Sequence, residues 1–364
     1  MENNFVIAKS GHELGVDCKR ATSRLHFSVL VYILVTSLVV SFASFGLGIF
    51  SIIAPGIYAT IMSTPLYQSI LVWTLQVLCM YVIGYPVFYF MTRHLEKRDL
   101  SNGEKLSFLN FIMLAIASVA TMFIGSVIAS NVSDIITEVL GIPTENATSD
   151  LILDTNIWIV VLVVVIIGPI FEELIFRKAF IDVIGKHNIG LAIFISGASF
   201  ALFHGNIHQT IYTFVGGLLF AWTYAKTKKI IYPILLHMFI NFVGTVPSLL
   251  VADSYDRILG MTNEELMATT DPQILADIMK VNAYVYMEIG FMVVGAIILI
   301  YMLCTGFFKL DRSGETKIPF FKKLGILIFN LGTIAFVAYS IISIVLELLL
   351  PLIEPWLENY LGTV

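Results

Sequence analysis

Long runs of apolar residues dominate this sequence and predict helices that cross a membrane. A span needs about 20 mostly apolar residues, and nine segments approach or reach that length. They are Phe27–Ile53, Ile70–Met91, Phe108–Ala129, Ile157–Arg177, Ile189–His204, Thr210–Ala225, Ile230–Val251, Ala283–Phe308 and Leu324–Leu350. Because the fifth and sixth segments are short, the pattern predicts an all-α, polytopic transmembrane helical bundle of about nine spans, with seven as the lower bound.

The composition agrees with this pattern. The chain is 58% hydrophobic and 13% charged, whereas soluble domains average about 25% charged residues. We therefore expect an integral, multi-pass protein of the lipid bilayer. The net charge of −5 and the lack of a basic tract predict no nucleic-acid partner. Cys18, Cys79 and Cys304 lack a C-x-x-C spacing and predict neither a disulfide framework nor a thiolate metal site.

The basic residues predict how the chain is oriented. With the N-terminus inside, only Arg257 and Lys280 among the 21 Lys and Arg residues fall outside. Cytosolic segments carry an excess of Lys and Arg, so the asymmetry favours N-in, C-out and an odd number of spans. The polar first 26 residues show no cleavable signal peptide.

The spans divide the chain into five parts. These are a cytosolic N-terminal tail (1–26), N-terminal helices with an acidic extracytosolic loop (27–156), a membrane core that carries the polar motifs (157–250), an extracytosolic loop (251–282) and C-terminal helices (283–364). Short helices are expected in the second loop. Thr262 and Glu265 match a capping box, and Asp271 precedes Pro272 as an N-cap precedes a first-turn proline.

Three polar motifs interrupt the apolar core. They are Glu172-Glu173-x-x-x-Arg177, Phe200-x-x-x-His204 and His237-x-x-x-Asn241. Ionisable groups at membrane depth are costly and commonly functional. Two carboxylates, two imidazoles, an amide and a guanidinium form a set that can activate water and hold an oxyanion. The motifs therefore predict a hydrolase that works inside the membrane.

The two adjacent glutamates point about 100° apart on a helix, and only Glu173 shares a face with Arg177. We interpret Glu173 and Arg177 as a structural clamp, and Glu172 as a general base that faces a cavity. The alternative is that both carboxylates only balance Arg177 and Lys178 at a cytosolic helix end.

The imidazoles also allow two interpretations. His237 and Asn241 share a helix face at i, i+4 and are suited to donate hydrogen bonds to a developing oxyanion. His204 follows a small-residue helix face that permits close packing. The alternative for all three is hydrogen bonding between buried helices. Their coincidence within one short stretch favours a shared site, whereas Glu288, near the predicted outer end of its span, fits a snorkelling side chain.

Together the motifs resemble the CPBP family, which comprises the CAAX proteases and bacteriocin-processing enzymes, also called the Abi family, and includes type II CAAX prenyl endopeptidases. The resemblance covers residues 157–245. It implies that Glu172 and His204 activate the attacking water, and that His237 and Asn241 stabilise the oxyanion. Glu173 and Arg177 would support the site, and the cavity would open to the cytosol.

One aspect of the predicted spans conflicts with a shared site. His204 lies about 22 Å along its helix from the inner face, whereas Glu172 lies only about 8 Å from Arg177, at 1.5 Å per residue. For the two side chains to meet, the fifth helix must tilt, start above the membrane or be re-entrant. We expect a tilt or a raised start.

The sequence also leaves a metal and two other functions open. Glu172, His204 and His237 are a possible ligand set for one zinc ion, although activation of water by glutamate and histidine requires no cofactor. We favour an endopeptidase that hydrolyses a membrane-associated peptide or protein in a bacterial cell membrane. The alternatives are a non-catalytic bacteriocin-immunity or scaffold protein, and a proton-coupled transporter.

Overall fold

The structure is a computed structural model that describes residues 11–101, 103–141, 147–310 and 319–361. Every regular element in these residues is a helix, so the predicted all-α class is confirmed. Seven helices of the described part are long and apolar enough to cross a membrane. The helices α10 (Ile189–Phe203) and α11 (Ile207–Thr227) occupy the fifth and sixth predicted segments.

The remaining helices match the other predicted segments, with π-helical stretches labelled η. Five long helices carry a single label: α1 (Gly11–Ile53), α5 (Phe108–Leu140), α12 (Ile231–Leu259), α14 (Pro272–Cys304) and α16 (Leu331–Leu361). The second span combines α3 (Pro65–Val77), η1 (Leu78–Gly84) and α4 (Tyr85–Thr92). The fourth combines α7 (Ile157–Val160), η2 (Val161–Ile167), α8 (Gly168–Glu172), η3 (Glu173–Ala179) and α9 (Phe180–Ile184). The short ones are α2 (Pro55–Ser63), α6 (Ala147–Leu153), α13 (Asn263–Ala268) and α15 (Phe320–Ile328).

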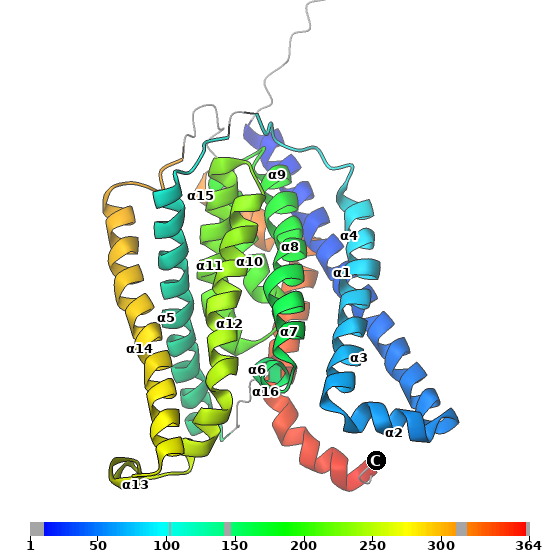
Figure 1. The fold of residues 1–364 in the computed structure, drawn as a ribbon. Helices are drawn as coiled ribbons and strands as arrows, with labels where there is room; N and C mark the ends of the chain where they lie inside the picture. The colour runs from blue at the N-terminus through cyan, green and yellow to red at the C-terminus, as the bar shows by residue number, and fades with distance from the viewer. Residues whose placement is uncertain (1–10, 102, 142–146, 311–318, 362–364) are drawn as a thin grey trace, which may run out of the picture.

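These helices form one bundle in which α5 and α14 stand at one edge and α1 to α4 at the other (Figure 1). The centre is formed by the α10–α11 hairpin together with α8 and α12. The two ends of the described chain lie at opposite ends of the bundle, as an odd number of crossings requires (Figure 1).

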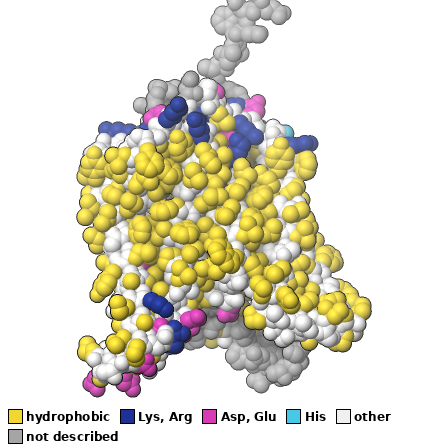
Figure 2. All heavy atoms as spheres, viewed as in Figure 1, with side chains coloured by type: hydrophobic (Ala, Val, Ile, Leu, Met, Phe, Trp, Pro, Cys, Tyr) yellow, Lys and Arg dark blue, Asp and Glu magenta, His cyan; other side chains and the backbone are white. Residues whose placement is uncertain are grey.

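Charge separates the same two ends. Lys and Arg side chains gather where α12 begins, and acidic side chains predominate around α13 (Figure 2). We call these the basic end and the acidic end. Lys9, Arg312 and Lys317 lie outside the described residues. The distribution agrees with the predicted asymmetry, and the N-in orientation itself stays a prediction.

The first helix starts earlier than predicted. It begins at Gly11 rather than Phe27, so most of the predicted tail belongs to it. Cys18, Leu25 and His26 are buried there, because α1 packs against α16 and α9. The His26 ring bridges two other helices, with Nδ1 2.6 Å from Thr333 Oγ1 and Nε2 2.7 Å from Ser199 Oγ. The helix is therefore extended by packing that its own sequence pattern did not show.

The last predicted segment, Leu324–Leu350, is two helices rather than one. The chain leaves helical geometry between α15 and α16 at Asn330, whose side chain donates to the Ile326 carbonyl and accepts from the Thr333 N–H. An asparagine that bonds backbone groups on both sides competes with the helical ladder. The single predicted span was therefore wrong at this point.

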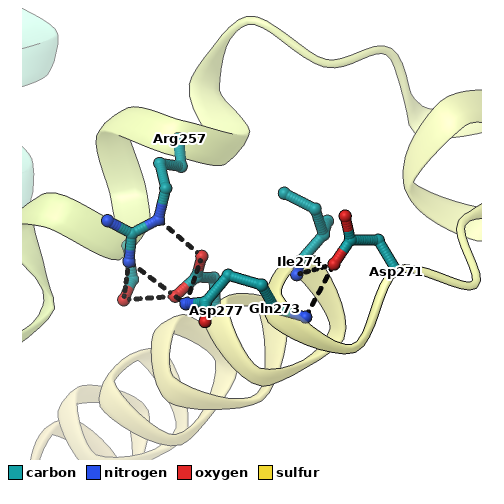
Figure 3. Close-up of polar contacts among 6 residues, drawn as sticks. Arg257, Asp271, Gln273, Ile274 and Asp277 are labelled. Carbon is teal, nitrogen blue, oxygen red and sulfur yellow. Dashed lines mark hydrogen bonds and ion pairs between the residues drawn. The ribbon is translucent and has the colours of Figure 1, made fainter.

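The predicted extracytosolic loops are shorter than expected, because α5 extends to Leu140 and α12 to Leu259. The capping box of α13 is present as predicted, with Thr262 and Glu265 bonding each other's backbone N–H groups. Asp271 caps α14 through the N–H groups of Gln273 and Ile274 (Figure 3).

A polar clasp joins α12 to α14 beside this turn. Arg257 donates from Nε and Nη2 to the two carboxylate oxygens of buried Asp277, at 2.7 and 2.8 Å (Figure 3). Ser254 Oγ donates to the same carboxylate at 2.8 Å. The charge of Arg257, one of the two basic residues at the acidic end, is thus neutralised by Asp277. The clasp also fixes α12, which carries His237, against α14, which forms one wall of the central cavity.

Candidate active site

The three motifs meet at one cavity in the centre of the bundle. This central cavity has a volume of about 690 Å³, and its walls include Glu172, His204, His237 and Asn241. The carboxylate comes from the end of α8, one imidazole from the end of α10, and the other two side chains from α12. The shared location was predicted from sequence, whereas the roles of the four side chains stay predictions.

Glu173 links two of the motifs. Its Oε2 lies 3.1 Å from Arg177 Nε, as the predicted clamp requires, and its Oε1 lies 2.9 Å from His237 Nδ1. Because an ionised carboxylate only accepts, Nδ1 donates this hydrogen bond. The other ring nitrogen, Nε2, then points to the cavity, 3.6 Å from Glu172 Oε2. Glu173 therefore orients His237 in addition to pairing with Arg177.

Two aromatic rings complete the burial of the guanidinium. Arg177 lies over Phe200 and Phe220, with 4.1 and 5.2 Å between its Cζ atom and the ring centroids. Rings of this kind attract a desolvated cation. His237 stacks on Phe220 and meets Phe200 edge-on. The phenylalanine of the second motif thus holds residues of the first and third motifs together.

The His204 ring is oriented by its own helix. Nδ1 lies 2.8 Å from the Phe200 carbonyl oxygen, and a carbonyl can only accept, so we assign the proton to Nδ1. The neutral ring then presents Nε2 as a hydrogen-bond acceptor. A side chain in this tautomer can accept a proton from water beside Glu172.

A raised start of α10 resolves the predicted mismatch in depth. The fourth span does not end at Arg177 but continues through α9 to Ile184, about 10 Å farther at 1.5 Å per residue. The α10 helix begins at that level, and Ser196 Oγ donates to the Phe176 carbonyl at 2.7 Å. From this common level His204 and Glu172 both lie deeper in the bundle. The expected raised start of the fifth helix is therefore confirmed.

Asn241 replaces a donor that a proline removes. The Gly168 N–H bonds the Val163 carbonyl, five residues earlier. With the same spacing of five residues, the Val164 carbonyl would accept from the N–H of residue 169. Residue 169 is Pro169, which has no N–H. The side-chain amide of Asn241 donates to the Val164 carbonyl at 2.9 Å. One of its two N–H groups is therefore structural, and the second is left for the cavity.

The central cavity extends in the direction opposite to the expected one. Its lining continues along α5 to Ser130 and along α12 to Ser248, toward the acidic end. Toward the basic end the space is filled by buried side chains, including Phe176 and Phe180. The lining of this cavity among the described residues therefore runs away from the basic end, where the expected cytosolic opening stays a prediction.

Comparison with known proteins supports the membrane peptidase assignment. Residues 154–243 match the family described as type II CAAX prenyl endopeptidase Rce1-like. That segment contains all three motifs. Over that segment, the chain is similar to the CAAX prenyl endopeptidases. It is also 35% identical over 153 residues to the putative membrane peptidase YdiL of Bacillus subtilis (strain 168), over 41% of this chain and 61% of YdiL. No solved structure matches.

The protein is a multi-pass integral membrane protein, as the seven long apolar helices of its described residues indicate. The Bacillus relative is consistent with the expected bacterial membrane. Since the chain spans only 61% of YdiL's length, its activity and substrates are matters for proposal.

Sequence reasoning missed the tyrosines of this candidate site. Tyr81 and Tyr212 line the central cavity with Glu172. A Cβ added at Gly168 would lie 3.4 Å from the Tyr81 hydroxyl and 3.8 Å from Glu172 Oε1. The Tyr81 hydroxyl and the Glu172 carboxylate therefore both lie next to Gly168. A tyrosine in an apolar span gives no local signal of such a position. His208 lies in the first turn of α11 and also lines the cavity.

The described residues bear on the zinc alternative in two ways. No group of three or more His, Cys, Asp or Glu side chains among them is arranged to hold an ion. Nδ1 of each motif histidine is already engaged, by a carbonyl in one case and by a carboxylate in the other. Such bonds also orient the histidines of zinc sites, so the zinc alternative and the metal-free reaction both stay predictions, and the steps below use the side chains alone.

Proposed function

We propose that this protein is an intramembrane endopeptidase that hydrolyses a peptide bond with an activated water molecule. The observation that carries the proposal is the convergence of Glu172, His204, His237 and Asn241 on one cavity within the apolar spans. The match of residues 154–243 to the CAAX prenyl endopeptidases supports peptide-bond hydrolysis as the class of reaction.

In the proposed reaction, Glu172 and His204 Nε2 accept hydrogen bonds from the water. Glu172 takes a proton as the water oxygen attacks the carbonyl carbon of the substrate. The C–N bond then breaks, and that proton passes to the leaving nitrogen. Both products are released, so no acyl-enzyme forms and no nucleophilic serine or cysteine is required.

His237 and Asn241 stabilise the charge that develops on the carbonyl oxygen. Asn241 donates its second amide N–H, because the first is bound to the Val164 carbonyl. His237 donates from Nε2, which requires a doubly protonated ring between Glu172 and Glu173. Removing one donor of this kind typically costs about 10²–10³ in kcat.

The test is cleavage of a peptide library by the purified full-length protein in lipid vesicles, with products identified by mass spectrometry. The library includes prenylated and unprenylated peptides, because the family description names prenyl substrates. We expect cleavage by the wild type and its loss in Glu172→Gln, His204→Ala and His237→Ala. Cleavage that persists in Glu172→Gln would refute the proposed general base.

A further inference from the structure

Glu288 is a carboxylate within a membrane helix that the proposed reaction does not use. It lies well inside α14, about 24 Å along the helix axis from Pro272 at 1.5 Å per residue. The sequence suggested a snorkelling side chain near the end of a span. In the structure Glu288 instead lines the same central cavity as Glu172, which corrects that interpretation.

No cation within the described residues neutralises this carboxylate. The ion pairs there join other side chains, and none includes Glu288. Its neighbour on the same helix, Tyr284, donates a hydrogen bond to it from the hydroxyl. By contrast, the acidic Asp277 on the same helix is bound by Arg257. An ionisable group left without a cation inside a membrane helix is a strong indication of function.

The cavity between Glu288 and the proposed active site has polar walls. The α5 wall presents Ser118, Thr121, Ser126 and Ser130, at helical spacing on one face. Ser118 is fully buried, and its Oγ has no hydrogen-bond partner among the described residues. The Ser118 hydroxyl suits an N–H or C=O group of an extended peptide, which otherwise would be left unbonded in the membrane. Thr121 Oγ1 already donates to the Ser118 carbonyl at 2.8 Å.

Close helix contacts give the distance between the two sites along the bundle axis. Gly295 of α14 packs against Ala120 of α5, and Gly244 of α12 packs against Met122, which is also in α5. Glu288 lies seven residues toward the acidic end from the first contact, and His237 seven residues toward the basic end from the second. The two positions are therefore separated by roughly 18 Å at 1.5 Å per residue, after the two-residue offset between Ala120 and Met122 is subtracted. That distance corresponds to about five to six residues of extended peptide.

We propose that Glu288 is a specificity residue that binds a cationic group of the peptide substrate, about five to six residues from the bond that is cleaved. The cation is a Lys or Arg side chain, or the terminal ammonium of a short substrate. Both form charge-assisted hydrogen bonds with a carboxylate. The inference rests on the proposed function, and it adds the substrate's charge and the position of that charge.

The test compares wild type, Glu288→Gln, Glu288→Lys and Glu288→Asp in vesicles with one library of membrane-associated peptides. For the wild type we expect cleaved peptides to carry Lys or Arg about five to six residues from the cut. Glu288→Gln should lower kcat/KM for these peptides about ten- to a hundredfold, as expected for loss of a charge-assisted bond. It should leave neutral peptides unchanged. Glu288→Lys should favour Asp or Glu at that position, and Glu288→Asp should retain the preference for cations.

Two further arms locate the cation and separate the two proposals. Replacing Lys with Gln in the substrate identifies a side chain, and acetylation of the N-terminus identifies a terminal ammonium. Glu138→Gln, an equal charge change on the exposed end of α5, is the matched control and should have no effect. Cleavage without any charge preference in the wild type, or with a preference unchanged in Glu288→Gln, would overturn the inference alone. Cleavage equal in wild type and Glu172→Gln would instead overturn the proposed function.

Discussion

At the scale of single residues, Arg177 is the most buried charge near the site. It depends on Glu173 and on two aromatic rings, and removing one partner of a buried ion pair leaves the other uncompensated. We expect Glu173→Ala and Arg177→Ala each to lower the free energy of unfolding by about 3–5 kcal/mol. The measurements are the thermal midpoint in detergent and the amount of protein in the membrane.

A double variant separates charge from packing in that pair. Glu173→Gln with Arg177→Met leaves no unpaired charge and should be more stable than either alanine variant. Lys229→Met, which removes an exposed charge, should leave the midpoint unchanged. Equal stability of Arg177→Ala and wild type would contradict the clamp.

Asn241 has two separable roles, one at a helix break and one at the cavity. Asn241→Ala should lower stability by about 1–3 kcal/mol, because the buried Val164 carbonyl loses its donor. It should also lower kcat. Pro169→Ala restores a backbone N–H at the break. In the Pro169→Ala background, Asn241→Ala should therefore lower stability less than it does in the wild type, but it should lower kcat by the same factor. A rescue of both quantities would show that Asn241 acts only through the helix.

The motif spacing was enough to predict which polar residues share a site, because i, i+4 positions on a helix project from one face. The contacts between helices could not be predicted in the same way. The Asn241 partner is a backbone carbonyl left without a donor by a distant proline, and the second ring on Arg177, Phe220, lies outside all three motifs. Such contacts depend on packing across the bundle, which the sequence pattern does not contain.

At the scale of helices, the Arg257–Asp277 clasp should determine how firmly α12 and α14 are joined at the acidic end. Asp277→Asn keeps the shape but removes the charge that receives Arg257. Since Arg257 is partly exposed, we expect a loss of only about 1–2 kcal/mol. Limited proteolysis within α13 should be faster in this variant and unchanged in Glu264→Gln, a control in α13 itself. Equal cleavage rates would contradict a stabilising clasp.

Helix existence was easier to predict from the sequence than helix ends. Each of the nine apolar segments has a helical counterpart, because about 20 apolar residues in a membrane can satisfy their backbone groups only as a helix. The errors occur where tertiary contacts override composition. Buried packing begins α1 at Gly11, and the side chain of Asn330 divides the last segment.

At the scale of the whole molecule, orientation decides which compartment supplies the substrate. The basic residues predict that the basic end faces the cytosol. The central cavity extends from Glu172 toward the acidic end, where its wall residue Ser130 is exposed. Together these two observations predict that substrate enters from the extracytosolic side or the outer leaflet. This replaces the cytosolic entrance that the family resemblance implied.

Single cysteines test this prediction directly, in a background where Cys18, Cys79 and Cys304 are replaced. In intact cells an impermeant thiol reagent should label Thr269→Cys at the acidic end and spare Leu100→Cys at the basic end. Ser130→Cys, in the cavity wall, should label as Thr269→Cys does, and labelling there should block cleavage because the adduct occupies the path to Glu172. If Leu100→Cys labels instead, the protein is inverted and its cavity opens to the cytosol. If Thr269→Cys labels but Ser130→Cys does not, the orientation stands and the entrance must lie elsewhere, between helices that face the lipid.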